Sequence, residues 1–191
     1  MQEIYSSNKN YFDLIIKDFG EKTEFCTIKE LSNTYLYEIY ITLKFIQEIL
    51  YNKDLYNELK EIRLEKLENE FWGGKEYPRF GCYKTNNRII SLNIRYFGSN
   101  VSDNDKAEVK EDTFADTIMH EIGHYVLIKY NKLEKTKKLY NTVEKCRNYF
   151  DQFDSDYLRS LSEDERIHEL YARAFSKNNR DILYKNNNKN F

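Results

Sequence analysis

His120-Glu121-Ile122-Gly123-His124 places two imidazoles four residues apart, with a carboxylate directly after the first imidazole. Residues i and i+4 lie on one face of an α-helix, so both rings can reach a single metal ion. Histidines with this spacing bind Zn²⁺ in zinc hydrolases, where the glutamate between them acts as general base on a water. The stretch therefore predicts His120 and His124 as zinc ligands and Glu121 as a catalytic residue.

The flanking sequence predicts the helix that this motif requires. Apolar residues recur at helical spacing from Thr113 to Tyr130, and Thr113 with Asp116 is expected to form a capping box. Gly123 costs about 1 kcal/mol relative to alanine inside a helix, which indicates close approach by a neighbouring element. The alternative is a buried amphipathic helix whose histidines only satisfy hydrogen bonds.

The third ligand has to come from elsewhere, because catalytic zinc sites usually combine three protein ligands with an open position. The last predicted helix opens with Ser162-Glu163-Asp164-Glu165, a capping box that gives Glu165 a structural role. Glu169 has no such role, and Ala172 and Ser176 on its face would allow close packing. We expect Glu169 as the third ligand and keep Glu165 as the alternative.

The apolar stripe of the same helix opposes this assignment. It is centred roughly opposite Glu169 on a helical wheel and consists of Ile167, Leu170, Tyr171, Ala174 and Phe175. Glu169 would then be a solvent-exposed residue, unless the helix is covered on both sides. His168 lies with the apolar flank, so we expect a core residue or a hydrogen-bond donor to the transition state rather than a ligand.

Two stretches together resemble a known family. His120 to His124, followed by Glu169-Leu170-Tyr171-Ala172-Arg173-Ala174-Phe175, resembles the Glu-zincin metallopeptidases. The closest similarity is to the anthrax lethal factor-like group and the Pro-Pro endopeptidases, in which the third ligand opens a Glu-x-x-Ala-x-x-Phe helix. Ile89-Ile90-Ser91-Leu92-Asn93 also resembles smaller zinc peptidases that cleave phage or mobile-element repressors. The resemblance implies a zinc metalloendopeptidase that acts on a protein or peptide substrate.

The chain departs from that family at two positions. Family members usually carry an acidic residue four places after the third ligand, where this chain has Arg173, and Asp116 would have to replace it as an acceptor for a ligand imidazole. The family's transition-state tyrosine corresponds to Ser162 here. Tyr157 is the nearest tyrosine, and with His168 it is our candidate for stabilising the transition state.

These departures leave two other functions open. The chain can be a degenerate zincin, a protein-interaction module that binds a partner without cleaving it. Alternatively it can be a regulatory peptidase dedicated to one repressor, with its N-terminal helices as the docking surface.

Hydropathy patterns predict an α+β fold that is mainly helical and zincin-like, with a small antiparallel hairpin beside the motif helix. The strand at residues 89–96, with one apolar and one polar face, is expected to be the edge that binds substrate. We expect one domain over residues 1–191: a helical region at 1–75, a catalytic core at 76–180 and a disordered tail at 181–191. The predicted helices are 29–51, 54–70, 113–130, 133–153 and 162–177, and the predicted hairpin strands are 80–83 and 88–97.

Composition limits the partners. A net charge of −2 gives no electrostatic support for nucleic-acid binding. No apolar run is long enough for a membrane span, and the first residues lack the pattern of a secretory signal. We therefore expect a cytoplasmic protein, with leaderless export or a trimmed mature form left open. The sequence does not indicate an oligomeric state.

Overall fold

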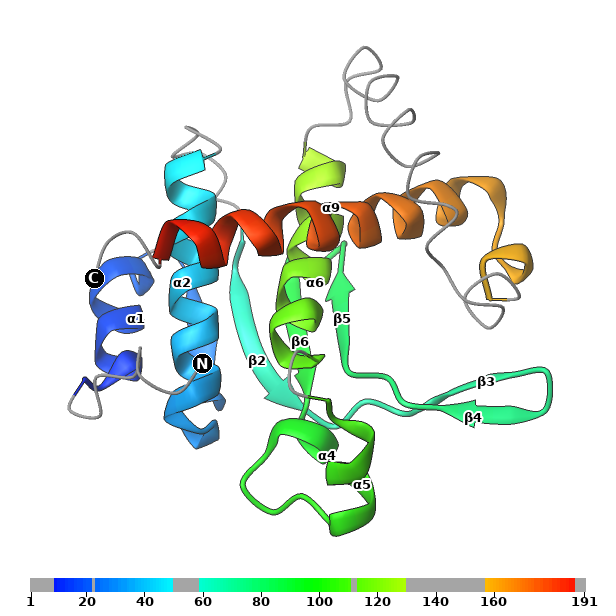
Figure 1. The fold of residues 1–191 in the computed structure, drawn as a ribbon, viewed down its shortest axis with the longest axis horizontal. Coiled ribbons are helices and arrows are strands. Elements are labelled where there is room, and N and C mark those ends of the chain that lie inside the picture. Colours follow the sequence, from blue (N-terminus) through cyan, green and yellow to red (C-terminus); the bar gives the residue numbers. More distant parts are fainter. Residues whose placement is uncertain (1–8, 22, 50–58, 111–112, 130–156, 188–191) are drawn as a thin grey trace.

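A computed structural model describes residues 9–21, 23–49, 59–110, 113–129 and 157–187 (Figure 1). Helices and small sheets are combined, which confirms the α+β class. The elements are α1 (Tyr11–Phe19), β1 (Glu24–Cys26), η1 (Ile28–Glu30), α2 (Asn33–Ile49), β2 (Glu61–Glu65), β3 (Glu70–Trp72), β4 (Lys75–Tyr77), β5 (Gly81–Lys84), β6 (Ile89–Asn93), α4 (Ile94–Phe97), α5 (Asp103–Glu108), α6 (Thr113–Lys129) and α9 (Glu163–Asn187).

The main sheet has four strands in the order β1-β2-β6-β5. The predicted hairpin is present as β5 and β6, which pair antiparallel. The sheet as a whole is mixed, because β1, β2 and β6 run parallel to one another. A second sheet, the β3–β4 hairpin, projects away from the body of the molecule in Figure 1.

The helix predicted over 54–70 is wrong where the structure describes it. Residues 61–65 form β2, and Glu70 begins β3. In β2, the buried residues Ile62 and Leu64 alternate with charged, partly exposed residues, so burial repeats with a period of two. Arg63 and Glu65 form an ion pair of 2.9 Å on the polar face, so the charged residues of this stretch lie on one side of a strand.

The strand expected to be the substrate-binding edge is instead central. β6 lies between β2 and β5, and all five of its residues are buried, including Ser91 and Asn93 on the face predicted to be polar. The strand ends at Asn93, because Ile94–Phe97 form the short helix α4. The described edge strand on this side of the sheet is therefore β5, not β6.

Helix α6 has its predicted start but a different cap. Thr113 is the first helical residue, and its Oγ1 accepts a hydrogen bond from the backbone N–H of Lys110 (2.8 Å), so the capping box predicted with Asp116 is wrong. The structure also contains α5, between α4 and α6, which is not among the helices predicted from the sequence. The helix predicted at 133–153 lies outside the described residues, as does residue 130.

Helix α9 begins as predicted and runs further. Ser162 and Glu165 form the expected capping box: the Ser162 N–H donates to Glu165 Oε2 (3.0 Å) and the Glu165 N–H donates to Ser162 Oγ (3.4 Å). The helix continues to Asn187 instead of ending near Lys177, so residues 181–187 are not the disordered tail that we expected. Leu183 is buried and holds this extension against the core.

Helix α9 crosses α6 in Figure 1, and the two helices meet at a point of very close approach. A Cβ atom added to Gly123 of α6 would lie 2.9 Å from Ala172 Cα and 3.2 Å from Ala172 O. This contact confirms the reason predicted for a glycine in the motif. It also buries the small-residue face of α9, while Leu170 and Ala174 are buried as well, so α9 is covered on more than one side.

No helix within the described ranges combines the length and the apolar character that crossing a bilayer requires.

We expect Gly123→Ala to lower the free energy of unfolding by about 1–2 kcal/mol in total, because the added methyl group pushes α9 away from α6 at a steric cost of about 2–3 kcal/mol. The gain in helix propensity, about 1 kcal/mol, acts in the opposite direction and is smaller than the steric cost. Urea unfolding followed by circular dichroism measures the effect. Asn178→Ala, at an exposed position of α9, is the control and should leave stability nearly unchanged. A variant as stable as the wild type would show that the helices do not need this contact.

Candidate metal centre

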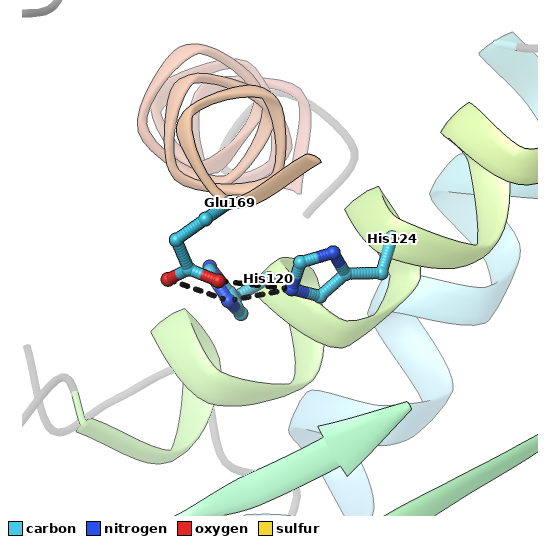
Figure 2. Close-up of side chains that lie close together, drawn as sticks. All are labelled: His120, His124 and Glu169. Atoms are coloured by element: carbon cyan, nitrogen blue, oxygen red, sulfur yellow. Dashed lines mark hydrogen bonds and ion pairs between the residues drawn. The ribbon is translucent and has the colours of Figure 1, made fainter. Parts of the chain in front are cut away.

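Three predicted ligands converge where α6 and α9 cross (Figure 2). The Nε2 atoms of His120 and His124 are 3.1 Å apart. Glu169 reaches from α9 to both rings: Oε1 lies 3.5 Å from His120 Nε2, and Oε2 lies 3.3 Å from His124 Nε2. Only 12% of the Glu169 side chain is exposed, so the alternative that Glu169 is a solvent-exposed residue is wrong.

These separations fit a small tetrahedral cation. An ion bound at about 2.0–2.1 Å from each of its tetrahedral ligands separates those ligands by about 3.3–3.4 Å. The distance between the two Nε2 atoms, and the distance from each Nε2 to one of the two Glu169 oxygens, lie within a few tenths of an ångström of that value. One donor atom from each of the three residues lies within 4.8 Å of the other two. Two imidazoles and one carboxylate are also a donor set that Zn²⁺ favours in catalytic sites. The cluster can therefore hold zinc, with one coordination position left for other groups.

The alternative ligand, Glu165, is engaged elsewhere. Its Oε2 accepts hydrogen bonds from the backbone N–H and the hydroxyl of Ser162, at 3.0 and 2.6 Å. Glu165 is exposed, and these hydrogen bonds lower the pKa of its carboxyl. Among the described residues, only His120, His124 and Glu169 form a cluster that could hold a metal ion.

Electrostatics within the cluster keep the ligand carboxylate charged. Burial would raise the pKa of Glu169, but His120, His124 and Arg173 outweigh it and hold that pKa well below its usual range. Burial would likewise lower the pKa of His120, but the Glu169 carboxylate raises it. The Glu169 carboxylate thus favours positive charge at the imidazoles. A divalent cation can supply that positive charge in place of the imidazole protons.

Arg173, the departure from the family pattern, contacts the third ligand directly. Its Nε donates a hydrogen bond of 2.9 Å to Glu169 Oε1. Its guanidinium carbon lies 5.5 Å from the centroid of the Tyr157 ring, within range of a cation–π interaction. The position at which the sequence departs from the peptidases that it resembles thus holds a cation that orients the Glu169 carboxylate.

Asp116, which we expected to be able to replace that acceptor, fastens α9 to α6. Arg180 Nη1 donates to both of its carboxylate oxygens, each at 3.1 Å. Its backbone carbonyl accepts a hydrogen bond from the Ser176 hydroxyl at 3.3 Å. These bonds lie beyond the Gly123–Ala172 contact along α9 and hold the crossing in place.

A cleft of about 1140 Å³ opens beside the cluster. β5, α6, α9 and residues 77–80 contribute its walls. Tyr157 and His168 both line this cleft, as the sequence prediction of their roles requires, and both are partly buried. Burial raises the pKa of Tyr157, so its hydroxyl stays protonated near neutral pH. Burial and the nearby His124 lower the pKa of His168.

The general-base candidate lies directly under the edge strand. Glu121 is buried, and burial raises the pKa of its carboxyl. A Cβ atom added to Gly81 of β5 would lie 2.7 Å from Thr117 Cγ2 and 3.0 Å from Glu121 Oε1. A side chain at Gly81 would therefore displace Glu121. We did not predict this residue from the sequence, although a glycine at the start of a strand is a local signal of close approach.

No family model, curated protein or solved structure matches this chain.

We expect one zinc ion per chain, bound by the three clustered side chains. His120→Ala, His124→Ala and Glu169→Ala should each reduce the zinc content severalfold or more, because losing one ligand removes a large part of the binding free energy. Elemental analysis after dialysis against trace zinc measures this. His168→Ala is the matched control, since His168 lines the cleft next to Glu169 but lies outside the cluster. Equal zinc loss in all four variants would contradict the ligand assignment.

Proposed function

We propose that this chain is a zinc-dependent metalloendopeptidase of the zincin type, which hydrolyses peptide bonds in a protein substrate. The observation that carries this proposal is the His120–His124–Glu169 cluster beside a buried Glu121, in a cleft bordered by an edge strand. A metal site used only for structure is normally closed by four protein ligands, whereas this cluster has three and faces a cleft.

Zinc bound there would polarise the carbonyl of the scissile peptide and bring the pKa of a coordinated water toward 7. The protein's own residues supply the remaining chemistry. Glu121 takes a proton from the attacking water and delivers it to the nitrogen of the leaving amine. Burial raises the pKa of this carboxyl, which brings the group nearer to the pH at which it can both accept and release a proton.

Negative charge then develops on the former carbonyl oxygen, and a hydrogen-bond donor must face it. The Tyr157 hydroxyl is the first candidate, because it lines the cleft and stays protonated at neutral pH. Arg173 lies over the ring and contacts Glu169, so one side chain links the tyrosine to the metal cluster. His168 is the second candidate for the same role.

Substrate binding uses the edge strand β5 in this proposal, in place of the β6 edge expected from the sequence. An extended peptide can add to a free strand edge through backbone hydrogen bonds, and this mode suits flexible protein segments. Gly81 brings that edge against Glu121, so a peptide paired with β5 would pass beside the general base.

The two other hypotheses from the sequence, an interaction module and a repressor-specific peptidase, stay predictions, as does a cytoplasmic location. If the chain is an interaction module, we expect no peptide cleavage at all. If it is a peptidase dedicated to one repressor, we expect cleavage of that one protein and little cleavage of mixed peptides. The case for a degenerate site rested on Arg173 and on the tyrosine missing at Ser162. The contact of Arg173 with Glu169 and the position of Tyr157 in the cleft count against that case.

Glu121→Gln tests the mechanism. We expect unchanged zinc content and a loss of turnover of about 10²–10⁴-fold, the usual contribution of a general base. Cleavage of a mixed peptide library, followed by mass spectrometry, measures turnover alongside elemental analysis. Glu165→Gln is the matched control, because glutamine can retain the capping box at that position. Turnover that survives Glu121→Gln would exclude this residue as the base.

Tyr157→Phe separates the two candidate donors. We expect kcat to fall on the order of 100-fold with KM and zinc content little changed, since the hydroxyl acts only on the developing charge. Tyr77→Phe, at another tyrosine that lines the cleft, should change neither constant substantially. If Tyr157→Phe has no effect and His168→Ala lowers kcat, the role belongs to His168.

A further inference from the structure

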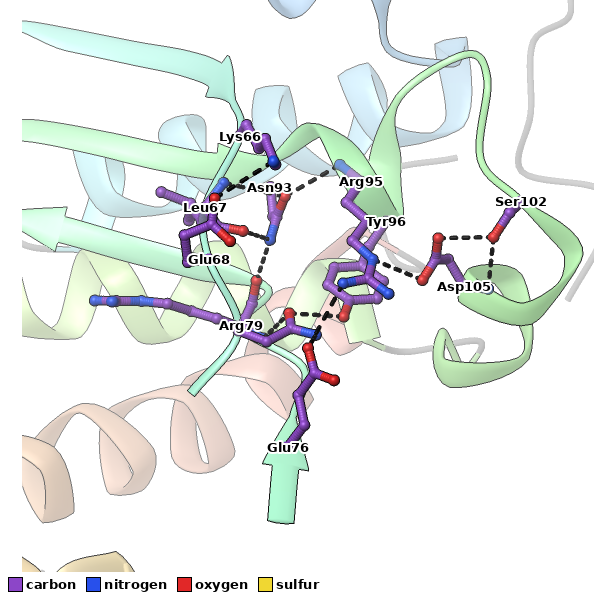
Figure 3. Close-up of polar contacts among 11 residues, drawn as sticks. Lys66, Leu67, Glu68, Glu76, Arg79, Asn93, Arg95, Tyr96, Ser102 and Asp105 are labelled. Atoms are coloured by element: carbon purple, nitrogen blue, oxygen red, sulfur yellow. Dashed lines mark hydrogen bonds and ion pairs between the residues drawn. The ribbon is translucent and has the colours of Figure 1, made fainter. Parts of the chain in front are cut away.

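Asn93, at the end of β6, fixes the segment that enters the cleft wall (Figure 3). The side chain is fully buried and makes four hydrogen bonds. Its Nδ2 donates to the carbonyl oxygens of Leu67 (3.0 Å) and Arg79 (2.7 Å). Its Oδ1 accepts from the backbone N–H groups of Leu67 (3.3 Å) and Arg95 (3.1 Å). All the hydrogen-bonding capacity of this buried amide is used: three bonds hold the segments on either side of the β3–β4 hairpin, and the fourth caps α4.

Further hydrogen bonds fix the backbone of Arg79. Its N–H donates to Asn69 Oδ1 (3.4 Å), an atom that also accepts the Tyr96 hydroxyl at 2.8 Å. The next residue, Phe80, accepts a hydrogen bond of 2.8 Å from the N–H of Asn93. The Cα atom of Arg79 is therefore held in place relative to β6, and hence relative to β5, which pairs with β6.

The Arg79 side chain leaves this network and enters the cleft. In Figure 3 it extends away from the other labelled residues, whereas Arg95 turns toward Asp105. Arg79 lines the cleft, and its Nη2 lies 3.1 Å from the sulfur of Cys82 on the edge strand. Cys82 directly follows Gly81, the residue against which Glu121 packs. The guanidinium is thus one residue along β5 from the general base.

The described contacts of Arg79 leave it able to bind a ligand. The sulfur of Cys82 is a weak acceptor, and the ion pair with Glu70 is long, at 3.5 Å, with both side chains partly exposed. Exposed pairs of this kind contribute little free energy. A guanidinium has five N–H donors in a planar fork that matches a carboxylate, so a second acidic group can be bound through two parallel hydrogen bonds.

The pairing of a substrate strand with β5 determines which substrate residue can bring an acidic side chain to Arg79. Residues directly opposite each other in paired strands present their side chains on the same face of the sheet. A substrate residue opposite Cys82 therefore presents its side chain on the face where Arg79 meets the Cys82 sulfur. Its neighbour opposite Gly81 lies beside Glu121.

We propose that Arg79 is a specificity-determining residue, which binds the carboxylate of a substrate aspartate or glutamate within one or two residues of the scissile bond. This inference rests on the proposed peptidase function. It defines the substrate class as flexible segments with an acidic residue at the cleavage site.

Binding, measured without turnover, tests the inference. A peptide library in which each position is fixed in turn as Glu, Gln or Lys is passed over immobilised, zinc-loaded Glu121→Gln protein. We expect Glu to be enriched over Gln by roughly tenfold at one position, as a charge-assisted bidentate contact provides. Adding Arg79→Gln should abolish that enrichment, and adding Arg79→Glu should transfer it to Lys at the same position.

Arg95→Gln is the matched control. Arg95 has a similar exposed fraction, 44% against 39% for Arg79, and acidic partners, but it does not line the cleft. It should leave the Glu enrichment intact. The inference is overturned if Glu is not enriched, including by absence of any binding, or if Arg79→Gln and Arg95→Gln reduce it equally. Enrichment without any cleavage by the wild type would instead reject the peptidase function and retain the acidic subsite.

Discussion

The contact between Gly123 and Ala172 is the constraint on which the rest of the site depends. Only a residue without a side chain lets the backbones of α6 and α9 approach so closely. At any larger separation the Glu169 carboxylate would not lie within 3.5 Å of both imidazoles. The glycine inside the motif is therefore as much a part of the site as the histidines on either side of it.

Ion pairs between arginines and carboxylates also hold α9 against α6. Arg173 binds the ligand carboxylate, and Arg180 binds Asp116 at the start of α6. Both arginines lie on α9 and follow Ala172 in the chain, so the helix that supplies the acidic group of the cluster also supplies two cations that hold it against α6. Buried or partly buried carboxylates are costly unless such partners are present. The arrangement lets an acidic residue occupy a largely apolar helix crossing.

Local patterns were enough to predict which three side chains cluster where α6 and α9 cross. The spacing of His120 and His124 is a property of one helix, and the capping box at Ser162 left Glu169 as the better third ligand. The burial of Glu169 could not be predicted, because a helical wheel does not show that α9 is covered on more than one face. The position of β6 in the sheet depends on strand order, which no single strand encodes. β2 was missed because alternating charges can occupy a polar sheet face as readily as a helix surface.

The connection between the two ligand helices has a further consequence. His124 and Glu169 are 45 residues apart in the chain, yet they meet at 3.3 Å. An ion held by both would act as a cross-link that removes conformational freedom from the unfolded chain. By the loop-entropy relation used for disulfides, a closed loop of this size is stabilised on the order of 4 kcal/mol. Metal supply would then govern how much of the chain is folded as well as whether the site is complete.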